Sequence, residues 1–279
     1  MAFEVNHSFR SQYWEAIDSG NWETGTFNVI DYFLNDSNVA LDLGCWAGPL
    51  TLYMAGKGAT VYAVDPDPEA FDALEVNVGL NPNLSGTIHT HKLAIGANNS
   101  QMPLHARSGY GNSSTSLLNR TRDKVFNSLT EVVSFLNFLE RNKITRLDFI
   151  KIDVEGGEFQ FLGQVEELLN RFEYPTILLS LHYSHLNESI HQSKIGMRWV
   201  SLVIMKLEQY TGFILFRKAL EVESRKVVSL GSRYKFVYDI NGQKVTSEEL
   251  TANFLMKKYS DLVFSNQEWT EHSSINYGT

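Results

Sequence analysis

Three acidic residues follow one apolar run closely enough to act together on a bound substrate. The run Arg146–Ile152 is followed by Asp153, Glu155 and Glu158, and His182 comes directly after a second apolar run. Carboxylates and imidazoles are common general bases, so these side chains could remove a proton from a substrate hydroxyl. Glu155 and Glu158 could instead simply favour the start of the next helix, where negative charge is stabilising.

The same side chains could also hold a divalent metal ion. Asp153, Glu155 and His182 offer the hard oxygen and imidazole donors that suit Mg²⁺ or a similar ion. Their spacing along the chain does not show that they converge. We therefore expect that the protein does not require a metal ion. If a metal ion binds, these three residues are its expected ligands.

A strand–turn–helix–strand pattern near the amino end indicates a site for a nucleoside. One apolar run ends at Gly44, and Gly48 precedes a predicted helix, Pro49–Gly56. Glycines let the backbone approach a ligand closely, and the start of a helix offers unpaired N–H groups. The next apolar run, Thr60–Val64, ends at Asp65, where a carboxylate suits the ribose diol in a doubly wound α/β fold.

The turn between these two strands discriminates among nucleoside cofactors. A dinucleotide site needs the pattern G-x-G-x-x-G, and Trp46 stands where the second glycine would admit a pyrophosphate. This indole disfavours NAD and FAD, whereas S-adenosylmethionine (SAM), which has no phosphate, tolerates it. We expect Asp42 near the amino-acid end of SAM and Asp65 at its ribose hydroxyls. The residues expected around the cofactor are Asp42, Gly44, Cys45, Trp46, Gly48, Asp65 and Pro66.

Alternating apolar and amphipathic segments predict the elements that would position these residues. Two short helices are expected within residues 8–36, ahead of the pattern described above. The later expected segments are helix Pro68–Val78, strand Thr87–Ile95, a loop-rich stretch Gly96–Arg122 with a short strand at Met102–Ala106, helix Thr130–Arg141, strand Arg146–Ile152, helix Glu158–Phe172, strand Thr176–Leu181, helix Arg198–Tyr210, and short strands at Gly212–Phe216, Tyr234–Tyr238 and Leu262–Phe264.

This order of elements predicts an α/β, Rossmann-like fold with a mostly parallel sheet flanked by helices. The two early helices form an N-terminal helical extension. We expect one domain, 1–279, made of N-terminal helices (1–36), a cofactor-binding core (37–182) and a C-terminal part on the substrate side (183–279).

Composition excludes several classes of protein. The net charge of −8, from 24 basic and 32 acidic residues, is unfavourable for nucleic acid, which needs a basic face. The mixed-charge run Arg217–Lys226 is interpreted as a solvated surface segment. A single cysteine, Cys45, rules out an internal disulfide and a zinc site built on several cysteines. The chain starts without an apolar signal segment and has no run that predicts a membrane span, so a cytoplasmic location is expected.

Three segments resemble the FkbM family of SAM-dependent methyltransferases. They are Leu41–Ala55, Leu93–Leu104 and Phe149–Glu158. The resemblance covers roughly Trp22 to His182, and it adds Glu23, in what looks like the family's entry helix, to the expected cofactor residues. It implies a class I methyltransferase fold with a seven-stranded sheet, acting on a hydroxyl of a small molecule or glycan. One departure is visible, because Ser180 stands where family members commonly carry an acid at the end of the fifth strand.

The residues and the resemblance together predict O-methylation, with a sugar hydroxyl favoured as the acceptor. Methyl transfer from a sulfonium is an in-line displacement, so the enzyme must align the acceptor and remove its proton. Either Asp153 or His182 is expected to be the base, and Glu155 is expected to orient the acceptor.

Other functions are disfavoured but stay open. An NAD(P)-dependent oxidoreductase is opposed by Trp46, and the only Tyr-x-x-x-Lys match, Tyr53 to Lys57, lies in the first predicted helix of the core. A SAM-binding fold without catalysis, serving as an interaction module, is opposed by the intact acids. A DNA amino-methyltransferase would need a Pro-Pro-aromatic tetrapeptide where this chain has Asp153–Gly156.

Overall fold

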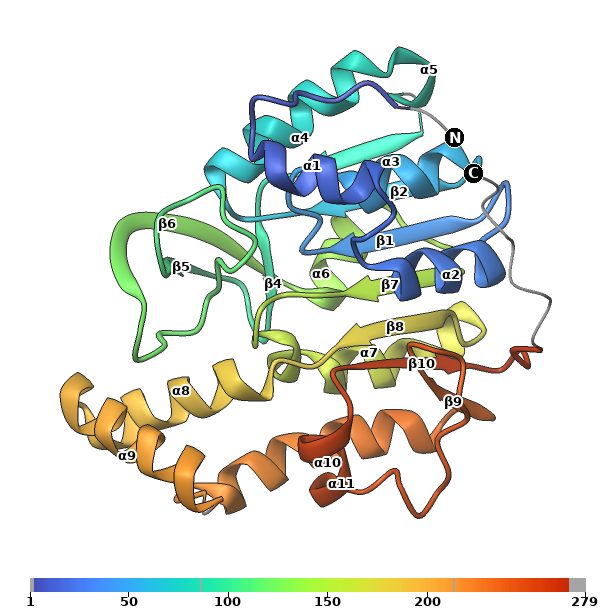
Figure 1. The fold of residues 1–279 in the computed structure, drawn as a ribbon. Coiled ribbons are helices and arrows are strands. Elements are labelled where there is room, and N and C mark those ends of the chain that lie inside the picture. Colours follow the sequence, from blue (N-terminus) through green and yellow to red (C-terminus); the bar gives the residue numbers. More distant parts are fainter. Residues whose placement is uncertain (1–2, 86, 213, 271–279) are drawn as a thin grey trace.

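The core of the molecule is a seven-stranded sheet (Figure 1). The computed structural model describes residues 3–85, 87–212 and 214–270. The strands lie in the order β3-β2-β1-β7-β8-β10-β9, and β10 runs antiparallel to both neighbours while the other adjacent pairs are parallel. This sheet confirms the predicted fold class. The strands are β1 (Val39–Leu43), β2 (Thr60–Val64), β3 (Ile88–His91), β7 (Phe149–Ile152), β8 (Thr176–Ser180), β9 (Phe236–Asp239) and β10 (Asp261–Ser265).

Helices cover both faces of the sheet, because successive side chains of a strand point to opposite sides. Leu41 and Leu43 of β1 pack with α6, α7 and α10 on one face, whereas Ala40 packs with α2 and α3 on the other. The helices are α1 (Ser11–Asp18), α2 (Thr24–Phe33), α3 (Pro49–Gly56), α4 (Pro68–Leu80), α5 (Pro82–Ser85), α6 (Phe135–Arg141), α7 (Leu162–Leu168), α8 (Tyr183–Ile195), α9 (Arg198–Thr211), α10 (Arg217–Ser232) and α11 (Ala252–Lys258). The two expected N-terminal helices are thus confirmed as α1 and α2.

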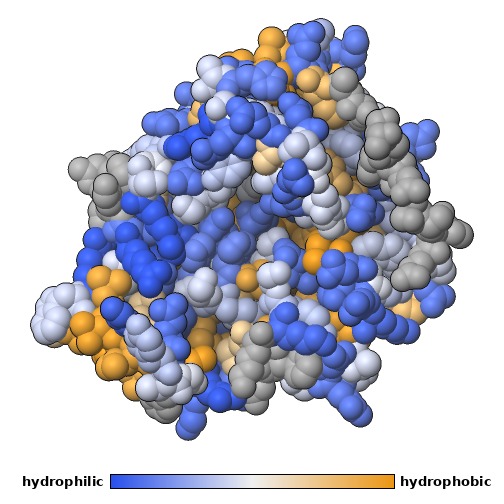
Figure 2. Space-filling view, in the orientation of Figure 1, coloured by the Kyte–Doolittle hydropathy of each residue, from blue (hydrophilic) through white to orange (hydrophobic). Residues whose placement is uncertain are grey.

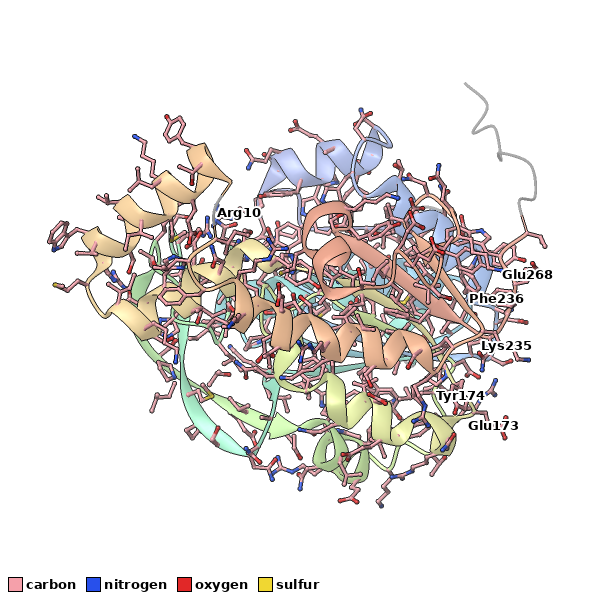
Figure 3. All side chains as sticks on the ribbon, turned by 90° about the horizontal axis from the view of Figure 1, so that it is seen from below. Arg10, Glu173, Tyr174, Lys235, Phe236 and Glu268 are labelled. Carbon is pink, nitrogen blue, oxygen red and sulfur yellow. The ribbon has the colours of Figure 1, made fainter. Side chains whose placement is uncertain are left out.

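The two ends of the strands lie on opposite sides of the molecule. Figure 3, seen from below, shows a group of labelled residues on the side where β8 and β9 begin, namely Glu173, Tyr174, Lys235, Phe236 and Glu268. Arg10 lies on the other side, where its guanidinium donates to the backbone oxygens of Tyr110 and Gly111. The parallel strands end on the side of Arg10, which is where a ligand crevice is expected in this fold.

A second sheet lies beside the ends of the central strands and corrects one prediction. It contains β4 (Ala94–Gly96), β5 (Ser100–Ala106) and β6 (Lys124–Ser134) in the order β4-β6-β5. The predicted strand Thr87–Ile95 is therefore divided, because β3 pairs with β2 in the central sheet and β4 pairs with β6 in the second. In Figure 1 the β5–β6 pair projects from the central sheet on the side of the carboxyl ends.

The predicted helix Thr130–Arg141 is wrong over its first half, which belongs to β6 as far as Ser134. Val132 and Val133 are adjacent and both buried, because they face different hydrophobic clusters on the two sides of the strand. Ser134 then caps α6 by accepting a backbone N–H of its first turn. Leu136, in the first turn of α6, is 40% exposed. The spacing of apolar residues in this segment fits a helix or a strand. The segment forms a strand because it pairs with β4 and β5.

The carboxyl-terminal third contains more helix than the sequence patterns predicted. Helices α8, α10 and α11 were not expected, and the predicted strand Gly212–Phe216 lies in the connection between α9 and α10, with residue 213 outside the described part. The run Arg217–Lys226, interpreted as a solvated segment, starts α10 and buries Leu220. Its charged side chains form the outer face of α10, with ion pairs such as Arg217 to Glu221. In the sequence, these charges obscured the apolar positions between them.

Three other predictions concern the later half of the chain, of which one needs adjustment and two are confirmed. The predicted helix Glu158–Phe172 is interrupted, with a 3₁₀ turn on each side of α7. The predicted strands Tyr234–Tyr238 and Leu262–Phe264 are confirmed as β9 and β10. β10 completes the sheet by inserting between β8 and β9.

Candidate active site

A cavity of about 560 Å³ opens at the carboxyl ends of β1, β2, β7 and β8, and its size suits a cofactor-sized ligand. Residues 22–26, ahead of and within α2, and the loop residues 112–117 close over it. The structure brings together every predicted site residue except Gly48. The predicted residues that line the cavity are Glu23, Asp42, Gly44, Cys45, Trp46, Asp65, Pro66, Asp153, Glu155 and His182.

The two glycines of the turn after β1 serve different purposes. Gly44 has φ 79°, and a Cβ there would overlap the carbonyl oxygen of Asp153, so only glycine lets the ends of β1 and β7 approach each other. Gly48 has φ 86° and caps the start of α3, and a Cβ there would run into the side chain of Leu74. Gly44 therefore shapes the cavity, whereas Gly48 sets the packing of the helix behind it.

Asp65, at the end of β2, organises the same turn while facing the cavity. Its two carboxylate oxygens accept the backbone N–H groups of Trp46 (2.9 Å) and Asp67 (2.8 Å). Burial raises the pKa of Asp65 to about 7, although these hydrogen bonds act in the opposite direction. Each oxygen keeps a further lone pair, so the carboxylate can still accept from a ligand hydroxyl.

Asp67 holds a loop over the cavity, in a stretch for which the sequence predicted little structure. Its carboxylate accepts the N–H of Gly111 (2.9 Å) and the hydroxyl of Thr115, and it also caps α4. The sequence signal was present, since Asp67 followed by proline is typical of a helix start. The indole N–H of Trp46 donates to the oxygen of Gly111 (3.0 Å). The Trp46 ring packs against Phe9, Tyr13 and Trp14.

One buried cation, Lys151 of β7, lies beneath the cavity. Its ammonium group lies 3.5 Å from Asp42 and 3.4 Å from Asp153, and it is almost inaccessible to solvent. Burial alone would lower the pKa of Lys151, but the carboxylates of Asp153 and Asp42 outweigh burial and raise it above its ordinary value. In turn, burial would raise the pKa of Asp153, and Lys151 and His182 lower it instead. Asp153 is therefore ionised at neutral pH.

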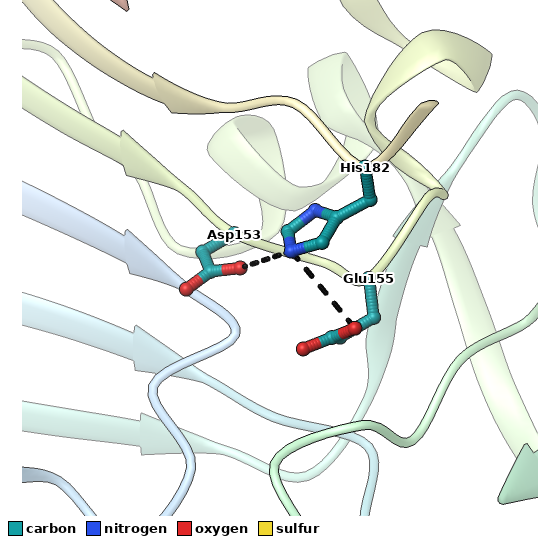
Figure 4. A group of neighbouring side chains, drawn as sticks. All are labelled: Asp153, Glu155 and His182. Atoms are coloured by element: carbon teal, nitrogen blue, oxygen red, sulfur yellow. Dashed lines mark ion pairs between the residues drawn. The ribbon is translucent and has the colours of Figure 1, made fainter. Parts of the chain in front are cut away.

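His182 lies among three carboxylates, two of which are drawn in Figure 4. Its Nε2 is 3.5 Å from Asp153 and 3.9 Å from Glu155, and its Nδ1 is 3.5 Å from Glu158. Burial disfavours the charged imidazole, but the nearby carboxylates of Glu158, Asp153 and Glu155 outweigh burial and raise the pKa of His182 to about 10. His182 is thus an imidazolium at neutral pH, which leaves Asp153 as the better-placed proton acceptor of the two predicted bases.

Sequence reasoning missed Arg120, a completely buried arginine beside the site. Its guanidinium donates to Asp123 (2.7 Å), contacts His185 Nδ1 (3.1 Å) and lies 3.9 Å from Glu155 Oε2. The same Glu155 oxygen lies 2.9 Å from His185. Glu155 therefore lies against Arg120 and His185 on its outer side. No spacing in the loop-rich sequence marked Arg120, because Glu155 and His185, which join it to the site, come from distant segments.

An acid does stand beside Ser180, at the end of the fifth strand of the sheet. Asp261 of β10 pairs in register with Ser180, whose hydroxyl donates to the Asp261 carboxylate (2.7 Å), and both residues line the cavity. The departure seen in the sequence is thus compensated from the antiparallel neighbour. Only the pairing of β8 with β10 reveals this, since the two residues are 81 positions apart.

The three predicted metal ligands converge, with their donor atoms within 4.8 Å of one another. Two carboxylates and an imidazole form a plausible donor set for a divalent ion. However, Lys151 already lies against Asp153, and Arg120 and His185 lie against Glu155. Lys151 and Arg120 therefore supply positive charge beside these two carboxylates. Glu155 Oε2 and His182 Nδ1 nevertheless remain buried without a hydrogen-bond partner among the described residues.

The strand order, with an antiparallel strand next to the edge, and the crevice at the carboxyl ends define a class I methyltransferase fold. The family described as Methyltransferase FkbM domain matches residues 35–200. The chain belongs to this family, which confirms the resemblance seen in the sequence.

Individual relatives cover the chain unevenly. A stretch of 52 residues, 18% of this chain and 27% of the relative, is 42% identical to a probable cobalt-precorrin-6B C(15)-methyltransferase (decarboxylating) of Methanothermobacter thermautotrophicus. The FkbM methyltransferase structure from Methylobacillus flagellatus is 19% identical, with a TM-score of 0.40, over 56% of this chain and 36% of that one. A TehB-like SAM-dependent methyltransferase from Corynebacterium glutamicum is 13% identical, with a TM-score of 0.43, over 94% of this chain and 97% of that one.

The chain thus spans only about a quarter of the curated relative and about a third of the FkbM structure. Within the described residues, no helix combines the length and apolar character needed to cross a membrane.

Proposed function

We propose that this protein transfers a methyl group from SAM to a hydroxyl of a small molecule or glycan, with a sugar hydroxyl favoured. The charge of the cavity carries this proposal. Its lining includes six carboxyl groups against the cations Lys151 and His182. Burial raises the pKa of two of them, Glu23 and Asp65, to about 7; the other four are Asp42, Asp153, Glu155 and Asp261. An acidic cavity suits a cationic sulfonium, and it disfavours the pyrophosphate of a dinucleotide.

The residues that would hold SAM lie on the β1 and β2 side of the cavity. Asp65 offers free lone pairs to ribose hydroxyls, and Gly44 lines the same cavity. Asp42 accepts the hydroxyl of Thr51 and pairs with Lys151, so it is fixed at the amino-acid end proposed for the cofactor. When bound, SAM supplies a methyl group on a positively charged sulfur, with a good leaving group already attached.

The acceptor would lie on the β7 and β8 side, where the chain's own residues handle its proton. The Asp153 carboxylate accepts the proton of the attacking hydroxyl, and Lys151 keeps that carboxylate ionised beforehand. The imidazolium of His182 donates to an acceptor oxygen rather than removing a proton. Glu155, fixed by Arg120 and His185, orients the acceptor.

A metal ion could bind only by competing with these cations. Asp153, Glu155 and His182 would be its ligands, and it would polarise the acceptor hydroxyl. We propose catalysis without it. The rival assignments, an NAD(P)-dependent oxidoreductase and a SAM-binding module without catalysis, predict no methylated product.

Incubation with methyl-labelled SAM tests the proposal directly. The acceptors would be a panel of mono- and oligosaccharides together with small-molecule alcohols, and products would be identified by mass spectrometry and NMR. We expect the label as a methyl ether on a hydroxyl oxygen. A product labelled on carbon or nitrogen would overturn the O-methylation, and transfer to none of these hydroxyls would remove the acceptor class.

A further inference from the structure

Helix α9 has its polar and apolar sides reversed relative to a helix that packs on a core. Only Ser201 and Glu208 of this helix are buried, and both face α8. Glu208 pairs with the buried His191 (3.1 Å). The outward side is apolar and aromatic instead; its exposed members are Trp199 (69%), Leu202 (40%), Val203 (53%), Leu207 (56%) and Tyr210 (80%). An amphipathic helix of a soluble domain normally turns its apolar stripe inward.

Further exposed apolar residues flank this helix along the chain. Met197 (55% exposed) precedes the helix and Leu215 (45% exposed) follows it. Figure 2 shows the apolar side chains gathered over α8 and α9, at the lower left of the view. The two helices project from the end of β8 there, away from the central sheet (Figure 1). Contiguous apolar surface of this kind marks an interaction site.

The charges around the stripe identify the kind of partner. Residues 189–218 contain five basic residues and one acid, Glu208, in a chain with a net charge of −8. Glu208 is buried, so the exposed charges within residues 189–218 are positive, and one of them, Arg217, pairs with Glu221 just beyond this range. The five exposed cations are Lys194, Arg198, Lys206, Arg217 and Lys218. The partner must therefore combine apolar contact with negative charge.

We propose that the outward side of α9 is a docking surface for an anionic lipid bilayer. Trp199 and Tyr210, near the two ends of the helix, are the residue types that favour a membrane–water boundary. The basic residues beside the stripe would contact lipid phosphates, and the helix would lie in the plane of the headgroups. A second copy of this chain fits less well, because a two-fold pairing of α9 would bring both sets of cations together without exposed acids.

Flotation of the full-length protein with lipid vesicles tests this surface. We expect binding to vesicles of phosphatidylcholine mixed with phosphatidylserine, little binding to phosphatidylcholine alone, and release as salt is raised, because salt screens the attraction. Leu207→Ser and Lys206→Glu should each weaken binding on the order of tenfold. The matched surface variants Leu129→Ser, at a site 67% exposed, and Lys235→Glu should bind like the wild type.

Three results would overturn the proposal. Failure to bind either kind of vesicle removes the membrane as partner. Equal binding to neutral and acidic vesicles removes the role of the cations. A dimer in light scattering that Leu207→Ser converts to a monomer would show that α9 is a self-association interface instead. None of these outcomes depends on methyl transfer, so this surface can fail or stand independently of the proposed function.

Discussion

Charge pairing decides the role of each side chain in the cavity. The sequence placed Asp153, Glu155 and His182 after two apolar runs, but their spacing did not show that they converge, which the structure does. The sequence could not predict that His182 is charged, since that depends on distances to Glu158 and its neighbours. Arg120 was likewise hidden from sequence reasoning, because it is brought to Glu155 by a loop whose path no local pattern determines.

Asp153→Asn should lower turnover by roughly 10²–10⁴-fold, the usual contribution of a general base. Affinity for S-adenosylhomocysteine should change little, because Asp153 belongs to the acceptor side. Steady-state kinetics and calorimetry on the same preparation measure both quantities. Asp148→Asn is the control and should stay active, because Asp148 precedes β7 at the opposite end of the strand. There it accepts the backbone N–H of Val39 and pairs with Arg146. Full activity in Asp153→Asn would exclude it as the base.

The charge of His182 predicts a specific dependence of stability on pH. Its folded pKa of about 10 lies above the ordinary histidine value of 6.5, so the protonated form stabilises the folded state. This contribution is complete below about pH 6.5 and is lost as the pH rises towards 10. The difference in unfolding free energy between the wild type and His182→Gln should therefore shrink across that range. A difference that stays constant or grows would mean that His182 is neutral in the folded protein.

At the scale of elements, the parallel core was predictable and its additions were not. A continuous apolar run such as Thr176–Ser180 predicts a buried strand with little ambiguity. Segments with mixed patterns, such as residues 124–141, fit helix or strand equally and are decided by pairing with distant strands. The loop between β5 and β6 is a similar case, because buried polar contacts with Asp67 hold it.

Asp67→Ala should affect both the fold and cofactor binding. Loss of the α4 cap should lower the unfolding free energy by about 1–2 kcal/mol. Release of Gly111 and Thr115 should also weaken SAM binding, since this loop closes the cavity. Chemical denaturation and calorimetry check the two effects.

Ser134→Ala provides the matched control, because it removes the cap of α6 at a position that does not line the cavity. It should cost similar stability and leave SAM affinity unchanged. Equal SAM affinity in Asp67→Ala and the wild type would show that the loop does not close over the cofactor.

At the scale of the whole molecule, the acidic net charge conceals two regions with separate properties. The cavity at the carboxyl ends of the strands gathers carboxylates, whereas the α8–α9 projection gathers cations and apolar side chains. Composition predicted the absence of a general nucleic-acid surface but could not separate these regions. The separation follows from the fold, which places α8 directly after the end of β8.

The central claim is that the acid-lined cavity holds SAM, and isothermal titration calorimetry tests it most directly. SAM and S-adenosylhomocysteine should each bind at one site, and NAD should give no heat. Asp65→Asn should weaken SAM binding by roughly tenfold or more, through loss of charged hydrogen bonds to the ribose. Absence of binding by SAM and S-adenosylhomocysteine, or tighter binding of NAD, would contradict the account.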